Sequence, residues 1–229
     1  MDYVVQSPSH HGDDWTVKSN CRDTGAIGAA PTTDRGRITR RRIVGAAAEV
    51  VAEKGALGAS LDEVGARAPA SRSQLYHYFD DKNDLLLAVA EATNDTVLGG
   101  QRDLFADLGT WDGLVQWADA LVAYQQERGG QGGCPIANLL GQLGEHDDGI
   151  RVVLASGFDR WEAAIRAGLM AMVDSGDLRP DTDVTWLASS TLASVQGGLV
   201  LSQARRDPLA LRRALDGVLA LIATYRMIG

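Results

Sequence analysis

Five side chains that can recognise a polyanion stand within six consecutive positions of the chain. They are Arg72, Ser73, Gln74, Tyr76 and His77. Arginine matches the acceptor edge of guanine and glutamine matches the edge of adenine, so both residue types can read bases in the major groove of DNA. Phenol and imidazole groups can contact the phosphates beside that groove. These residues predict a DNA-binding surface, provided that one helix presents them together.

The residues around this run predict two short helices joined by a tight turn. Ser60 and Glu63 form an S-x-x-E capping box, so a first helix starts at Leu61. Pro69 ends that helix, and Ser71 is the N-cap of a second one. Two such helices form a helix-turn-helix. Because many short helix pairs only pack together, this pattern alone leaves DNA binding and a purely structural role open.

The charge of the chain is unevenly distributed. The 229 residues carry a net charge of −8, which argues against a protein that nucleic acid covers on all sides. Residues 35–82 nevertheless carry a net charge of +3, whereas residues 83–229 carry −8. A short basic module before a long acidic one suggests that only the basic module meets a polyanion.

No set of residues predicts catalysis or a bound cofactor. The sequence contains no G-x-S-x-G, H-E-x-x-H, P-loop or G-x-G-x-x-G motif, and its four histidines show no metal-ligand spacing. The acidic cluster at 145–148 lacks the ligands of a closed shell, so we interpret it as a solvated loop. We therefore predict no catalytic residue, no metal and no cofactor. Cys134 is interpreted as a buried structural thiol, with a redox-sensing thiolate as the alternative.

The cysteine content and the N-terminus bear on the compartment. Two cysteines are too few for a disulfide scaffold, and the polar, acidic start of the chain shows no signal peptide, so we predict a cytoplasmic protein. Residues 184–204 are uncharged and long enough to span a bilayer, but ten of them are Ser, Thr, Gln or Gly. We therefore expect a buried helix at a subunit interface there and no contact with a membrane.

Hydrophobic periodicity predicts an all-α protein. Ile43, Ala47 and Val50 repeat at helical spacing in a helix that begins at Thr39. Further helices are predicted at 83–106, 112–128, 135–144, 148–175, 183–204 and 208–227. Residues 1–34 show no period and predict a disordered extension, with an arm that reaches DNA as the alternative. The expected domains are this extension, a helix-turn-helix DNA-binding domain at 35–82 and a helical domain at 83–229.

Several short segments together resemble a known family. They are Arg41-Arg42-Ile43, Glu53-Lys54-Gly55, Ser60-Leu61-Asp62-Glu63-Val64, Ser71-Arg72-Ser73, Leu75-Tyr76-His77-Tyr78-Phe79, Lys82 and Leu85-Leu86. The set resembles the amino-terminal domain of TetR/AcrR-type transcriptional regulators. That resemblance implies a three-helix DNA-binding head, a fourth connecting helix and an all-α body that binds a ligand and dimerises. The segments 133–139 and 196–199 are similar to the multidrug- and antibiotic-responsive subgroup of these regulators.

One position departs from the family pattern. The family usually has a glycine in the turn between its second and third helices, where Pro69 stands in this sequence. Proline is not expected to adopt the positive φ of a glycine C-cap, so we expect the turn to close in a different way.

Three sets of site residues follow from these patterns. The expected DNA-binding residues are Arg41, Ser60, Ser71, Arg72, Ser73, Gln74, Tyr76, His77 and Lys82. Large aromatics of the body are by default core residues, but together with two polar amides they also describe a small-molecule cavity. The expected ligand-binding residues are Trp117, Tyr124, Asn138, Gln142, Phe158 and Trp161. The last two predicted helices would form a four-helix dimer interface through Gly197, Val200, Leu215 and Leu219, with packing inside one chain as the alternative.

These patterns and the resemblance together predict a ligand-responsive, DNA-binding transcriptional regulator. Its expected form is a homodimeric repressor that binds a palindromic double-stranded DNA operator and is released by a small apolar or aromatic effector. The alternatives are an activator of the same fold and a helical protein-interaction module that has lost DNA binding. The lack of catalytic motifs disfavours an enzyme.

Overall fold

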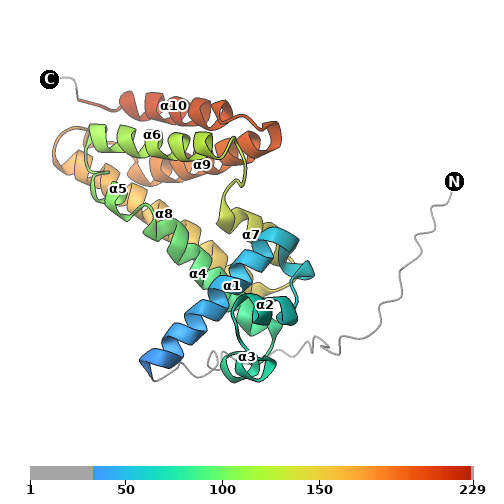
Figure 1. The fold of residues 1–229 in the computed structure, drawn as a ribbon. Helices are drawn as coiled ribbons and strands as arrows, with labels where there is room; N and C mark the ends of the chain where they lie inside the picture. The colour runs from blue at the N-terminus through green and yellow to red at the C-terminus, as the bar shows by residue number, and fades with distance from the viewer. Residues whose placement is uncertain (1–32, 228–229) are drawn as a thin grey trace.

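The structure, a computed structural model, describes residues 33–227, which form ten α-helices (Figure 1). They are α1 (Asp34–Gly58), α2 (Leu61–Arg67), α3 (Arg72–Tyr78), α4 (Lys82–Gly99), α5 (Arg102–Ala106), α6 (Trp111–Glu127), α7 (Pro135–Leu143), α8 (Asp148–Asp174), α9 (Val184–Arg205) and α10 (Leu209–Ala223). Within residues 33–227 no β-strand forms, and one isolated bridge joins Leu178 to Arg226. The all-α prediction is confirmed.

The first helix is longer than its hydrophobic pattern indicates. α1 begins at Asp34, ahead of the expected start at Thr39, because the Thr33 hydroxyl accepts a hydrogen bond from the Gly36 N–H at 3.1 Å. The predicted disordered extension otherwise lies outside the described residues. Near its end α1 bends at Gly55, whose φ of 78° suits glycine.

Helices α1 to α3 form one compact unit, which we call the head. Its core consists of buried side chains from all three helices and from the residue after α3: Ile43, Ala47, Val50, Val64, Leu75 and Phe79. Arg67 of α2 also forms two hydrogen bonds to the Glu53 carboxylate of α1, at 2.8 and 2.7 Å. These bonds lower the pKa of Glu53 and fix the angle between α1 and α2.

Helices α4 to α10 form the body. Figure 1 shows α4 and α8 running side by side from the head towards α6, α9 and α10, which pack together at the opposite end of the molecule. α4 and α8 approach closely because Gly157 of α8 lies against Asn94 of α4. A Cβ atom at Gly157 would lie 2.2 Å from Asn94 Oδ1. Asn94 Nδ2 in turn donates a hydrogen bond to the Val153 carbonyl at 2.7 Å, which stabilises the register of this crossing seen in the structure.

α9 is long and apolar enough to cross a membrane, yet it packs inside the body. Its contacts are with α8 and α10, and it buries Leu187, Val195 and Leu199 among them. Only the inner face of α9 is buried within this chain, and residues such as Val200 on its outer face are exposed. The subunit interface expected at residues 184–204 stays a prediction.

Two of the four expected dimer residues face the interior of the chain. Leu215 and Leu219 of α10 are only 0% and 9% exposed, because α10 turns its apolar stripe onto α9. Within this chain their side chains pack on α9, and their expected role in subunit contact stays a prediction. Gly197 and Val200 lie on the outer side of α9, and Val200 is 55% exposed.

A neighbouring glycine makes the close approach between α9 and α10. A Cβ atom at Gly198 would lie 2.9 Å from the Cα atom of Leu211, which is backbone and cannot swing aside. Nothing lies within 4 Å of the corresponding position at Gly197. The glycine pair thus divides its roles, with Gly198 packed inside the chain and Gly197 on the surface.

We expect Gly198→Ala to lower the free energy of unfolding by about 1–3 kcal/mol, since the new methyl group must push two backbones apart. Urea denaturation at a fixed protein concentration measures this loss. The matched control is Gly45→Ala in α1, where the added Cβ meets nothing within 4 Å and should stabilise the helix by about 0.5–1 kcal/mol. Equal stability of Gly198→Ala and wild type would contradict the close α9–α10 contact.

Candidate nucleic-acid interface

α3 begins with a complete capping box. Ser71 Oγ accepts a hydrogen bond from the Gln74 N–H at 3.3 Å, and Gln74 Oε1 accepts one from the Ser71 N–H at 2.9 Å. A seven-residue helix is unstable by itself, so these bonds and the buried Leu75 hold α3 against the head. The N-cap predicted at Ser71 is confirmed, and so is the one at Ser60.

The exposed face of α3 carries the side chains expected to read DNA. Arg72, Ser73, Tyr76 and His77 are all exposed. The Arg72 guanidinium lies 6.0 Å from the centre of the Tyr76 ring, one helical turn further on. A cation, a hydroxyl and a phenol therefore share one face of a short helix, which is what contact with base edges and phosphates requires.

Gln74, expected to contact DNA, is also part of the α3 cap, a role that the S-x-x-Q spacing of Ser71 and Gln74 could have indicated. Its side-chain oxygen is bound to the Ser71 backbone within the capping box. Bidentate pairing with adenine uses both the oxygen and the nitrogen of a glutamine amide. Gln74 can make that pair only by giving up its cap bond, whereas its Nε2 atom can donate to a base while the cap remains.

The turn between α2 and α3 keeps a left-handed conformation despite its proline. Pro69 has a positive φ of 24°, and the Ala70 N–H donates to the Gly65 carbonyl at 2.9 Å. This is the long hydrogen bond of a Schellman closure, with Pro69 at the position that normally favours glycine. The expectation that proline would not adopt a positive φ is therefore wrong, but the closure still differs from that of a glycine turn, because Pro69 has no N–H to donate the second Schellman bond. The backbone bond and the packing of α3 impose the conformation, and the proline ring is strained by it.

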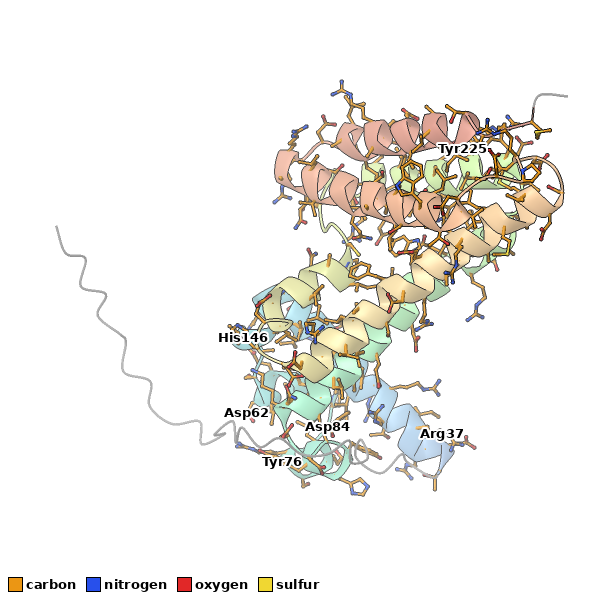
Figure 2. All side chains as sticks on the ribbon, turned by 180° about the vertical axis from the view of Figure 1, so that it is seen from behind. Arg37, Asp62, Tyr76, Asp84, His146 and Tyr225 are labelled. Carbon is orange, nitrogen blue, oxygen red and sulfur yellow. The ribbon has the colours of Figure 1, made fainter. Side chains whose placement is uncertain are left out.

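Arginines of α1 lie at the same end of the molecule as α3. Figure 2 shows Arg37 and Tyr76 at the end far from Tyr225, which follows α10. Arg41 is exposed on this part of α1. Arg40, which the sequence did not single out, lies 5.2 Å from the centre of the Phe79 ring and so ties α1 to the end of α3.

Two further expected DNA contacts are engaged inside the head. The Ser60 hydroxyl accepts from the Glu63 N–H at 3.3 Å and donates to the Glu63 carboxylate at 3.1 Å. Hydrogen bonds from Lys54 and Ser60 lower the pKa of Glu63. Lys82 Nζ donates to the Leu57 carbonyl at 3.4 Å, and partial burial lowers the pKa of Lys82. Lys82 must turn outward before it can contact a phosphate.

The chain matches two family descriptions, one for each end of the molecule. Residues 43–89 match "Bacterial regulatory proteins, tetR family", and residues 111–218 match "Tetracyclin repressor-like, C-terminal domain". The chain belongs to the TetR family of bacterial transcriptional regulators. It is accordingly a transcriptional regulator and not an enzyme.

Relatives and solved structures agree with this family. The chain is 28% identical over 180 residues to an HTH-type transcriptional regulator of Mycobacterium tuberculosis, covering 73% of this chain and 86% of that protein. It is 24% identical over 193 residues to the HTH-type transcriptional repressor DhaR of Mycobacterium sp. (strain GP1), covering 80% and 89%. A TetR-family regulator from Mesorhizobium loti shares the fold with a TM-score of 0.72 at 22% identity, covering 85% of this chain and 100% of that one.

The ligand-binding residues expected in this TetR-family body do not converge on one site. Trp117 is fully buried, and its Nε1 donates to Gln101 Oε1 at 3.0 Å. Trp161 is also buried, but its Nε1 has no hydrogen-bond partner among the described residues. Phe158 is half-buried three positions before Trp161 on α8. These aromatics are mainly core residues of the body.

The other three expected ligand residues lie at or near the surface. Tyr124 is 51% exposed, with the Arg128 guanidinium 5.2 Å from its ring centre. Asn138 Nδ2 donates to the Gly132 carbonyl at 2.6 Å and fixes the loop before α7. None of the six expected ligand residues lines the pocket between α4, α5 and α8. Cys134 is buried, and burial raises the pKa of its thiol, which favours a structural thiol over a thiolate sensor.

Gln142 instead joins the body to the head. Its Oε1 accepts a hydrogen bond from the Ala56 N–H at 2.7 Å. That N–H follows the bend at Gly55, where the helical bonding of α1 is interrupted. Close by, Asn83 Nδ2 at the start of α4 donates to Asp147 Oδ2 at 2.7 Å, and Asp147 is the N-cap of α8. The first bond joins the head to α7, and the second joins the start of α4 to the start of α8 within the body.

We expect Pro69→Gly to raise the free energy of unfolding by about 1 kcal/mol. Relief of roughly 1–3 kcal/mol of backbone strain and one new N–H donor outweigh the roughly 1–2 kcal/mol by which glycine favours the unfolded chain. Thermal and urea unfolding measure the change. Pro69→Ala, which restores the N–H but keeps a Cβ at positive φ, should gain less. A Pro69→Gly protein less stable than wild type would contradict a strained turn.

We expect Gln142→Ala to destabilise the protein by about 1–3 kcal/mol, since the Ala56 N–H loses its acceptor in a buried place. Amide hydrogen exchange should show faster exchange at Ala56 than in the wild type. Gln142→Glu keeps an acceptor oxygen and is the matched control, so it should retain most of the protection. Unchanged exchange at Ala56 in Gln142→Ala would show that this bond does not hold the head to the body.

Proposed function

We propose that the protein is a homodimeric repressor that binds a palindromic DNA operator through α3 of each protomer and releases it when a small molecule binds the body. The observation that carries the proposal is the exposed face of α3, where Arg72, Ser73 and Tyr76 stand together. In helix-turn-helix proteins the first turn of the second helix enters the major groove. The soluble, DNA-binding character of TetR regulators supports a cytoplasmic location.

The outer faces of α9 and α10 supply the surface for the second protomer. Small and apolar side chains are exposed there: Ala193, Gly197, Val200 and Leu201 on α9, and Gly217 and Ala220 on α10. Helices with such residues can approach a symmetric copy closely. Because these faces lie at the end opposite α3, a two-fold axis through them leaves both copies of α3 free to meet one side of the DNA (Figure 1).

α4 supplies a physical route from ligand to DNA. It starts at Lys82 beside the head and ends at Gly99 beside α5. A ligand changes operator affinity only through its different affinities for two arrangements of the protein. Movement of α4 against α8 would alter the distance between the two heads of the dimer. Binding to a palindromic operator depends on that distance, because it must match the spacing of the half-sites. The repressor named among the relatives supports the sign of the regulation.

The test is selection of binding sequences from random double-stranded DNA, followed by gel-shift titration at several salt concentrations. We expect a palindromic site and an affinity that falls steeply with salt. Arg72→Ala should cost about 1–3 kcal/mol and relax the preference at one position in each half-site, because a bidentate arginine contact would be lost. Arg166→Ala, an exposed arginine of α8, is the matched control and should bind as the wild type does.

Sedimentation, together with the same gel-shift titration, tests whether the protein dimerises through the outer face of α9. Val200→Asp places a charge on the outer face of α9 without entering the core, so it should yield monomers in sedimentation and lose operator binding. Leu219 is unsuitable for this purpose because it is buried within one chain. A selected sequence without symmetry, or full operator affinity in Arg72→Ala, would contradict the proposal.

A further inference from the structure

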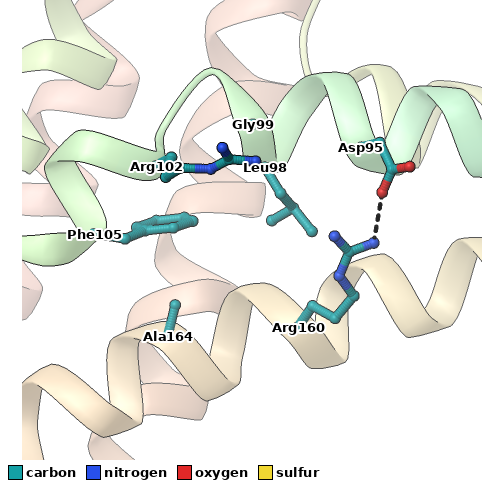
Figure 3. A pocket seen from close by; sticks show the side chains of 7 residues that line it. All are labelled: Asp95, Leu98, Gly99, Arg102, Phe105, Arg160 and Ala164. Atoms are coloured by element: carbon teal, nitrogen blue, oxygen red, sulfur yellow. Dashed lines mark hydrogen bonds and ion pairs between the residues drawn. The ribbon is translucent and has the colours of Figure 1, made fainter.

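A pocket of about 460 Å³ opens between the end of α4, α5 and the middle of α8 (Figure 3). The pocket is open to solvent on one side, so a bound molecule would be only partly enclosed. Its apolar lining comes from Leu98 of α4, Phe105 of α5 and Ala164 of α8. The polar lining comes from Asp95, Arg102 and Arg160. The pocket is therefore amphipathic, with apolar groups and charged groups arranged around one space.

The charge of this pocket is opposite to that of the surrounding body. Arg160 Nη1 lies 2.9 Å from Asp95 Oδ1, so one of the two arginines that line the pocket is paired with a carboxylate. No carboxylate among residues 33–227 lies within ion-pair distance of Arg102, whose side chain is exposed. Two guanidinium groups and one carboxylate leave a net positive charge in a body that is acidic overall. Such a pocket attracts an anion and disfavours a cation.

We propose that this pocket binds an amphipathic carboxylate, with its anionic group on Arg102 and Arg160 and its apolar part on Leu98, Phe105 and Ala164. Arginine presents a planar set of donors that matches a carboxylate in geometry as well as in charge. An aryl or alkyl group of moderate size fits the apolar lining. The inference rests on the proposed function only in naming this molecule as the effector.

The same pocket gives the carboxylate a way to act on DNA binding. Asp95 lies on α4 and Arg160 on α8, so their ion pair links these helices, although both side chains are more than half exposed and such a pair contributes little stability by itself. A bound carboxylate competes with Asp95 for Arg160 and weakens that bond. α4 is about 27 Å long at 1.5 Å per residue and reaches the head at its other end. A ligand that favours the arrangement without the ion pair therefore shifts α4 and the head together.

Isothermal titration calorimetry on the full chain tests the site, with octanoate and 4-phenylbutyrate as probes and octanamide as the neutral match. We expect both carboxylates to bind and octanamide to bind about tenfold more weakly or worse, since it lacks the charge. Arg102→Gln and Arg160→Gln should each weaken octanoate by about tenfold. Arg166→Gln, which leaves the pocket untouched, should bind octanoate as the wild type does.

The variant Asp95→Asn distinguishes two roles of Arg160, which are binding of the ligand carboxylate and pairing with Asp95 to hold α4 to α8. If Arg160 binds the carboxylate, removing its competitor should strengthen octanoate binding, whereas Arg160→Gln weakens it. If the pair only holds α4 to α8, the two variants should change octanoate binding in the same direction. That second result would overturn the assignment, as would equal affinity for octanoate and octanamide or no binding of either carboxylate.

A gel-shift titration of the selected operator completes the test. We expect saturating octanoate to lower operator affinity by about 5- to 150-fold, and operator to weaken octanoate by the same factor. Operator binding without any carboxylate binding would overturn this inference and leave the proposed function standing. Carboxylate binding at the arginines without any selected DNA sequence would overturn the proposed function alone. Binding of both with no mutual effect would overturn the role of the carboxylate as effector.

Discussion

α4 packs against the head at its start and against α8 of the body along its length. This packing constrains the rest of the structure. Leu85 and Leu86 are buried where α4 packs on α1, and Asn94 and Leu98 are buried where it crosses α8. The crossing leaves no room for a side chain at Gly157, and Asn94 is bonded across it to the Val153 carbonyl. Closely packed interfaces move between discrete arrangements rather than deforming gradually. A shift of α4 against α8 would therefore also change the position of α1 and the head.

The exposed face of α3 is positioned by few interactions, and most of them are local. α3 has seven residues, and its stability comes from the capping box, the burial of Leu75 and the contact of Arg40 with Phe79. Gln74 completes the cap by accepting the Ser71 N–H, so the stability of α3 depends on a side chain that we expect to contact DNA. Backbone strain at Pro69 further lowers the stability of the turn before α3. The head is thus an element of modest stability that depends on its junction with the body, where Gln142 accepts the Ala56 N–H.

The two buried tryptophans of the body lie outside the pocket between α4, α5 and α8, whose one aromatic lining residue is Phe105. Trp117 and Trp161 fill the core between long helices, as large apolar side chains do when they are not needed for recognition. The space that remains open lies beside charged residues of α4, α5 and α8. Its chemistry is that of two guanidinium groups above an apolar lining, although the body as a whole is acidic. The overall charge of a domain therefore did not indicate the polarity of its pocket.

The sequence by itself determined most of the helices and the position of the helix-turn-helix. The single helix predicted at 83–106 is wrong, because the chain breaks after Gly99 into α4 and α5. Caps at Ser60 and Ser71 depend on groups three residues away, and hydrophobic periods depend on neighbours three and four residues away, so both are encoded locally. Only the tertiary structure decided which neighbour each face meets. Leu215 and Gly197 belong to equally apolar helices, yet one is buried and the other exposed. Gln142 and Ala56 are 86 residues apart, and no local pattern links them, because the crossing of helices rather than their sequence spacing selects the partner.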